Sequence, residues 1–172
     1  MKKLKRAGIS IAEMCIVLAV IAIASTVVIT FTIMVSARSS ASVTKLNAYN
    51  DIQVSQVILE NWMDSMHTEG AYVNTEGMGL QAVKKNGENV EFYLEVYLQD
   101  GQLVAPLPDG TELTCPISTV KEFRFSQLPE ATVDRNVLYF CTVAYEVQNP
   151  TGEYVPFEET FTIRPRVGQT QP

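Results

Sequence analysis

The residues able to carry out chemistry are few and widely separated in this chain of 172 residues. Its three cysteines, Cys15, Cys115 and Cys141, form no CxxC pair, and its single histidine is His67. Zinc sites and dithiol redox sites need such residues at close spacing. The sequence also has no serine or cysteine nucleophile motif, no phosphate-binding glycine loop and no carboxylates at metal-ligand spacing. We therefore expect no enzymatic activity, no catalytic residue, no cofactor and no metal site.

Glu13 is a carboxylate at the edge of a long apolar segment. Residues 14–37 contain no charged side chain, whereas four basic residues lie among the first six positions. On insertion scales, an acid at the centre of a membrane helix costs about 2.5–3.5 kcal/mol. A cation about 4 Å away contributes about 4 kcal/mol at an effective dielectric near 20, before desolvation. A cationic partner can therefore offset the burial of Glu13.

Residues 14–37 are also long enough to cross a membrane. A helix of these 24 residues spans about 36 Å, and the hydrocarbon core is about 30 Å thick. The basic leader is expected to stay in the cytoplasm, with the rest of the chain outside. Cleavage of a secretory signal at Ala22-Ile23-Ala24 would leave an apolar mature end, and Cys15 lacks the small residues that precede a lipoprotein cysteine. An uncleaved signal anchor stays open.

The stretch KRAGISIAEMCIVLAV, residues 5–20, joins a short basic leader ending in Gly8 to Glu13 and the apolar run. This combination resembles the prepilin-type N-terminus of type IV pilins and type II secretion pseudopilins, over about residues 2–36. The resemblance implies that prepilin peptidase cuts after Gly8 and methylates the new amino group of Ile9. It also implies that Glu13 pairs with the amine of a neighbouring subunit.

The resemblance implies a structural role as a pilin, minor pilin or pseudopilin in a type IV pilus-like filament. The partners would be other pilin-like subunits, prepilin peptidase, the membrane platform of the assembly machine and the lipid bilayer. The chain would first span the bacterial cytoplasmic membrane once, with its N-terminus in the cytoplasm and its C-terminal domain outside. It would then join an extracellular or periplasmic filament. The alternative is an uncleaved single-pass anchor that displays a binding module.

The fold class expected is α+β, with a long N-terminal helix packed against an antiparallel sheet. After the leader, residues 1–8, neither glycine nor proline occurs before Gly70, which predicts one continuous helix. Its first half, 9–36, is the expected transmembrane or filament-core part, and its second half, 37–69, is amphipathic. Residues 70–164 form the expected sheet domain, and residues 165–172 a flexible tail.

The amphipathic half has two apolar arcs on opposite sides of the helix, at 100° per residue. One arc holds Val43, Leu46, Val54, Val57 and Ile58, and the other holds Tyr49, Ile52, Leu59, Trp62, Met63 and Met66. Two arcs predict two packing partners, namely the sheet of the same chain and neighbouring subunits. A fully buried core helix is the alternative. The small residues of SARSSAS, 36–42, either allow close helix approach at the membrane exit or form a solvated neck.

Period-two patterns after Gly70 predict strands joined by tight turns. EFYLEVYL, KEFRFS, NVLYFCTVAYEV and YVPFEETFTI all alternate apolar and polar residues. Turns are expected at Asp100-Gly101, at Pro108-Asp109-Gly110 and from Asn149 to Gly152. Cys115 and Cys141 fall on inward faces of these strands, on the oxidising side of the membrane. They form either a disulfide or two buried free thiols.

The charge of the chain argues against nucleic acid as a partner. The net charge is −6 overall. Without the four basic residues of the first six positions, nine Lys and Arg stand against nineteen Asp and Glu, a net charge of −10. Nucleic-acid affinity needs basic contacts to phosphates, so no nucleic-acid contact is expected.

Overall fold

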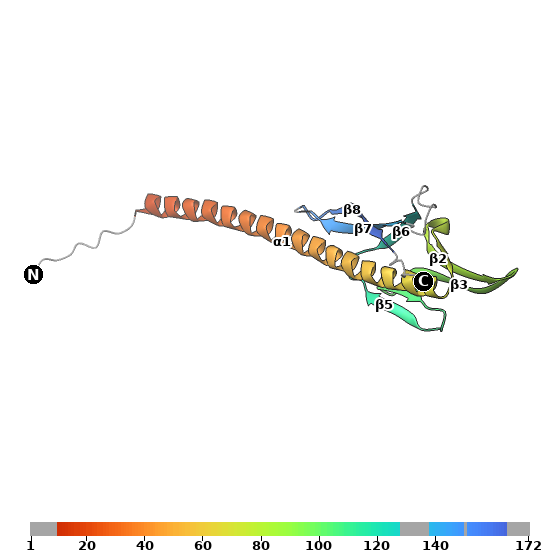
Figure 1. The fold of residues 1–172 in the computed structure, drawn as a ribbon. Coiled ribbons are helices and arrows are strands. Elements are labelled where there is room, and N and C mark those ends of the chain that lie inside the picture. Colours follow the sequence, from red (N-terminus) through yellow and green to blue (C-terminus); the bar gives the residue numbers. More distant parts are fainter. Residues whose placement is uncertain (1–9, 128–137, 150, 165–172) are drawn as a thin grey trace, which may run out of the picture.

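The computed structural model describes residues 10–127, 138–149 and 151–164. In it α1, Ile11–Thr68, is one unbroken helix of 58 residues, about 87 Å long at 1.5 Å per residue. Figure 1 shows the helix projecting as a long stalk from a head of β-strands at its C-terminal end. The predicted α+β class is therefore confirmed. Gly8, Ile9, the leader and the tail 165–172 lie outside the described residues.

The C-terminal end of α1 is set by Gly70. This glycine adopts a left-handed conformation with φ of +73°, which an L-residue with a Cβ adopts only at a cost. Its N–H donates to the carbonyl of His67 at 3.1 Å, and the Ala71 N–H donates to that of Met66 at 2.9 Å. These two bonds form a Schellman motif, which satisfies carbonyls that the helix leaves free. The helix therefore ends where the sequence predicted.

The strands of the head form two antiparallel sheets. The five-stranded sheet contains β1 (Tyr72–Asn74), β2 (Leu80–Asn86), β3 (Asn89–Gln99), β4 (Gln102–Pro106) and β5 (Glu112–Pro116), in that order, with the short 3-10 helix η1 (Glu76–Met78) between β1 and β2. The three-stranded sheet contains β6 (Glu122–Gln127), β7 (Tyr139–Gln148) and β8 (Tyr154–Ile163), with β7 in the middle. The sequence predicted a single sheet and gave no sign of β1, β2 or η1.

The predicted turns between strands are present. Asp100 and Gly101 have φ of +50° and +72°, the two positive values that a type I′ hairpin turn between β3 and β4 requires. The turn at Asp109 is closed by its carboxylate, which accepts the Thr111 N–H at 2.9 Å. Asn149 closes the last turn in the same way, since its side-chain oxygen accepts the N–H groups of Thr151 and Glu153.

Both sheets pack against the second half of α1, so the helix forms the centre of the head. It contacts β1, β4 and β5 of one sheet and β7 and β8 of the other (Figure 1). Trp62 is completely buried at this junction, and its indole N–H donates to the carbonyl of Pro106 at 2.7 Å. The alternation predicted for β7 is confirmed, because Tyr139, Cys141, Val143, Tyr145 and Val147 are all buried.

Two polar contacts tie the sheets to each other and to the helix. The Tyr139 hydroxyl on β7 donates to the carbonyl of Val73 on β1 at 2.9 Å. Asp51, buried on α1, accepts the backbone N–H groups of residues 118, 119 and 120 at 3.0, 2.7 and 3.2 Å. These N–H groups belong to the segment that leads from β5 to β6, and hence from one sheet to the other.

Candidate functional site: the uncovered face of the N-terminal helix

The first part of α1 is not covered by any described part of the chain. Every residue from 11 to 36 is exposed, although most of these side chains are large and apolar. The segment is long and apolar enough to cross a membrane, by length and composition. Exposed apolar surface of this extent marks contact with lipid or with another protein.

The three threonines in this apolar part satisfy their hydroxyl hydrogen bonds within the helix. The hydroxyls of Thr26, Thr30 and Thr32 donate to the carbonyls four residues earlier, each at 2.9 Å. A polar group in hydrocarbon costs free energy unless it is bonded, and here no external partner is needed. These threonines are therefore compatible with lipid and with a dry helix contact.

Glu13 takes part in a capping box at the start of α1. Ser10 is the N-cap residue; its hydroxyl accepts the Ala12 N–H at 3.3 Å, and its own N–H donates to the Glu13 carboxylate at 2.9 Å. A serine followed three residues later by glutamate is a known signature of this motif, and it is readable from the sequence. Interpreting Glu13 only as an assembly residue missed this local role.

The second half of α1 buries one apolar arc and leaves the other uncovered. Ile52, Leu59, Trp62, Met63 and Met66, which all belong to one predicted arc, are buried against the sheets. The opposite arc is exposed: Val43, Leu46, Val54 and Val57 have exposed fractions of 46 to 59%. The alternative of a fully buried core helix is therefore wrong. We call Val43, Leu46, Val54 and Val57 the outer stripe.

Two residues lie differently from the arcs in which they were placed. Tyr49 belongs to the arc that the structure buries but is exposed, and Ile58 belongs to the other arc but is half-buried against the core. Both lie at the margins of their arcs on a helical wheel. For a residue at the margin of an arc, its angle on the helical wheel does not determine whether it is buried. The position of the neighbouring strands determines it.

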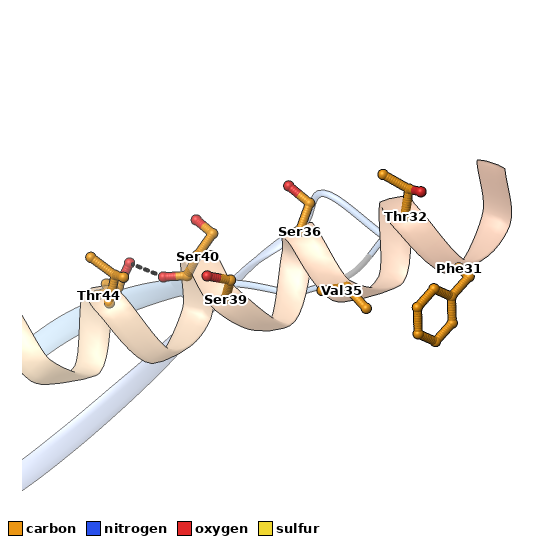
Figure 2. A pocket seen from close by; sticks show the side chains of 8 residues that line it. Phe31, Thr32, Val35, Ser36, Ser39, Ser40 and Thr44 are labelled. Atoms are coloured by element: carbon orange, nitrogen blue, oxygen red, sulfur yellow. Dashed lines mark hydrogen bonds between the residues drawn. The ribbon is translucent and has the colours of Figure 1, made fainter. Parts of the chain in front are cut away.

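A shallow depression of about 650 Å³ lies between the two halves of the helix. Its lining comes from α1 alone: Phe31, Thr32, Val35, Ser36, Ser39, Ser40, Val43 and Thr44 (Figure 2). Thr32, Ser36, Ser40 and Thr44 stand at four-residue intervals, and Thr44 donates its hydroxyl proton to the carbonyl of Ser40. Small residues at this spacing let a second helix approach closely.

The three cysteines are free thiols in the structure. Cys115 on β5 and Cys141 on β7 are both buried, in different sheets. Burial raises the pKa of both thiols, because a thiolate would lose its hydration there. Neither is poised as a nucleophile. Cys15 is exposed on the apolar part of α1.

The described residues include no group of three or more His, Cys, Asp or Glu side chains that could hold a metal ion. His67 serves the end of α1, since its Nδ1 lies 2.7 Å from the carbonyl oxygen of Met63. Apart from Glu13 on the stalk and the buried Asp51, the described acidic residues are spread over the surface of the head.

The fold and its uncovered surface define an α+β protein with an exposed apolar helical stalk and a two-sheet head. No family model, curated protein or solved structure matches the chain.

Proposed function

We propose that this protein is a pilin-like structural subunit, cleaved after Gly8 and assembled through α1 into a type IV pilus-like filament. As a pilin, minor pilin or pseudopilin it would start as a single-pass protein of the bacterial cytoplasmic membrane, with its head outside. Its partners would be further pilin-like subunits, prepilin peptidase and the membrane platform of the assembly machine. The proposal rests on the N-terminal pattern and on the uncovered face of α1.

The observation that carries the proposal is the outer stripe. Val57 lies 21 residues beyond Ser36, about 32 Å further along the helix axis. Lipid around residues 11–36 therefore does not reach it. An exposed apolar stripe on this part of the helix needs a protein partner, and a neighbouring helix of the same kind would cover it along its whole length. An uncleaved single-pass anchor would explain the apolar stalk, but it would not explain the exposed outer stripe.

Glu13 supports the same proposal through its charge. Cleavage after Gly8 would create an ammonium group on Ile9 at the membrane edge, and methylation keeps its charge. A carboxylate of one subunit would then pair with the amine of its neighbour as the helices pack. Moving from lipid into a bundle of apolar helices costs the stalk little, because both surroundings are apolar.

The mature N-terminus separates this proposal from the alternative, an uncleaved single-pass anchor that displays the head as a binding module. Mass spectrometry of the protein purified from its native host should find N-methylated Ile9 as the first residue. Replacing Gly8 by a bulkier residue should leave the leader in place. Met1 retained on the membrane-bound wild-type protein would decide for the anchor.

A further inference from the structure

A cleft of about 280 Å³ lies where the two sheets of the head meet. Its walls come from the end of β3, the start of β4, the start of β6 and η1. They are mostly apolar: Met78, Val96, Leu98, Leu103, Phe123 and Phe125. Val96, Leu103 and Phe125 are buried, whereas Met78 and Leu98 are exposed at the opening, with exposed fractions of 63 and 37%.

Among the described residues, the polar groups of this cleft leave one cation without an ion-pair partner. Glu122 pairs with the Arg124 guanidinium, whose Nε lies 3.3 Å away and whose Nη2 also binds Glu158. The Tyr97 hydroxyl donates to Glu112. Lys121 is exposed beside the cleft and forms no ion pair with any described residue. The cleft thus combines a mixed apolar and polar lining, which includes the Glu122 carboxylate, with an ammonium group that forms no ion pair with a described residue.

The opening is formed by a backbone that is held in an unfavourable conformation. Met78 has a φ of +69°, a left-handed value that is disfavoured for a residue with a Cβ, directly after Gly77 at +61°. This conformation keeps an apolar side chain in solvent at the mouth of the cleft. Local strain of this kind is concentrated at binding sites, and methionine adapts its shape to a ligand.

We propose that the cleft binds a small apolar carboxylate, with its apolar part between Leu103 and Phe123 and its carboxylate on Lys121. At about 30 Å³ per water-sized group, the volume accommodates about nine or ten non-hydrogen atoms. Octanoate has this size, and so does the C-terminal residue of a peptide that ends in leucine. The site is independent of whether the chain is cleaved or assembled, because every group in it belongs to the head.

The test uses the full chain in lipid nanodiscs, with methyl-¹³C methionine and NMR detection. The Met78 signal is assigned with Met78→Leu, and octanoate, 1-octanol and butyrate are titrated separately. Octanoate should shift the Met78 methyl signal saturably, at least about tenfold more tightly than octanol, and butyrate should not. Met14 and Met34, in the apolar part of α1, report partition of the ligands into lipid.

Substitutions then separate the cleft from the general surface of the head. Lys121→Gln should weaken octanoate binding about tenfold, to the level of octanol, and the matched control Lys85→Gln should not change it. Leu98→Trp should fill the cleft and abolish the shift, with unchanged Met63 and Met66 signals showing that the core is intact. No saturable Met78 shift at 10 mM octanoate, or equal binding by wild type and Lys121→Gln, would overturn the proposal.

The source of the carboxylate is distinguished by peptides. Acetyl-Ala-Ala-Leu with a free C-terminus is compared with its amide and with octanoate. Tighter binding of the peptide acid than of octanoate assigns the site to a protein C-terminus, and the reverse order assigns it to a free carboxylic acid. Equal binding of the peptide acid and its amide contradicts a carboxylate site.

Discussion

At the scale of single residues, Glu13 and Asp51 are two carboxylates on one helix with different surroundings. Glu13 is exposed and binds one backbone N–H in a capping box, so its charge remains available to a second partner. Asp51 is buried and already receives three backbone N–H groups and the Ser118 hydroxyl. The first is therefore suited to an interaction between chains, and the second to holding the fold together.

The two roles of Glu13 can be separated by a pair of substitutions. Glu13→Gln keeps a side chain that can accept the Ser10 N–H but removes the charge. Ser10→Ala removes the cap, at about 1 kcal/mol, but keeps the charge. If Glu13 pairs with the amine of a neighbour, Glu13→Gln should lower incorporation into filaments strongly and Ser10→Ala only slightly. Immunoblots of sheared filaments measure this, and mass spectrometry checks that both variants are cleaved. The opposite order would leave Glu13 with a capping role alone.

Asp51→Asn should destabilise the head. All three backbone N–H groups bind Oδ2, and Oδ1 accepts only the Ser118 hydroxyl. In the asparagine variant the amide oxygen is a weaker acceptor for the three N–H groups, and the N–H₂ group at the other position cannot accept the Ser118 hydroxyl proton. We expect a loss of about 2–3 kcal/mol, or a fall in Tm of about 4–12 °C, measured by circular dichroism. Glu146→Gln is the matched control, since Glu146 is exposed on β7. A Tm equal to that of the control would show that the bonds to residues 118–120 contribute nothing to stability.

At the scale of elements, α1 has two surfaces with different surroundings. Its buried arc and its outer stripe lie on opposite sides, so packing against the sheets leaves the outer stripe free for a second partner. The helix continues without a break toward the N-terminus, where the exposed apolar stalk begins beyond the small and polar residues 36–42. Because the helix is continuous, a contact made by its membrane part and a contact made beside the head are held at a fixed spacing along its axis.

A charge on the outer stripe should block assembly without unfolding the head. Val57→Glu puts a carboxylate where a neighbouring helix would exclude water, and each 1.4 kcal/mol of that cost lowers the equilibrium tenfold. We expect incorporation into filaments to fall at least about tenfold at unchanged Tm. Val90→Glu makes the same change at an exposed valine of β3, far from α1 in sequence, and should assemble normally. Normal assembly of Val57→Glu would remove the outer stripe from the interface.

At the scale of the whole molecule, the head is held together by buried tyrosines that connect its parts. Tyr139 links the two sheets through Val73, and the Tyr145 hydroxyl donates to Glu159 of β8 at 2.6 Å. Burial raises the pKa of Tyr139 to about 12, and burial together with Glu159 raises that of Tyr145 to about 12, from 10.0. In both cases the folded state favours the neutral phenol over the phenolate.

Stability should therefore fall in alkali, and the direction follows from these pKa values. Below pH 10 the phenols are neutral in both states, and the stabilisation that they provide is fully present. Between pH 10 and 12 the unfolded chain loses protons that the folded chain keeps, so the free energy of unfolding decreases. Thermal unfolding followed by circular dichroism at each pH measures the decrease. Tyr145→Phe should make it shallower, and an unchanged slope would show that Tyr145 does not contribute to it.

Much of the secondary structure of this protein is determined by interactions between residues that are close together in the sequence. The absence of glycine and proline between Gly8 and Gly70 predicts one helix, because each interior residue can keep its backbone hydrogen bond. Period-two alternation predicts β3 and β7, and Asp100-Gly101 predicts the hairpin between β3 and β4, since few residues accept positive φ. The S-x-x-E pattern at residues 10–13 was readable in the same way.

The tertiary structure alone decided which of two equally apolar arcs is buried, how the strands divide into two sheets and that Cys115 and Cys141 are buried in different sheets. It also decided that a cleft opens between the sheets, beside Lys121. These features depend on contacts between residues far apart in the sequence, such as Asp51 with residues 118–120 or Tyr139 with Val73. Neither periodicity nor turn chemistry specifies such pairs, because both describe a segment and its immediate neighbours, whereas burial is a property of the assembled head.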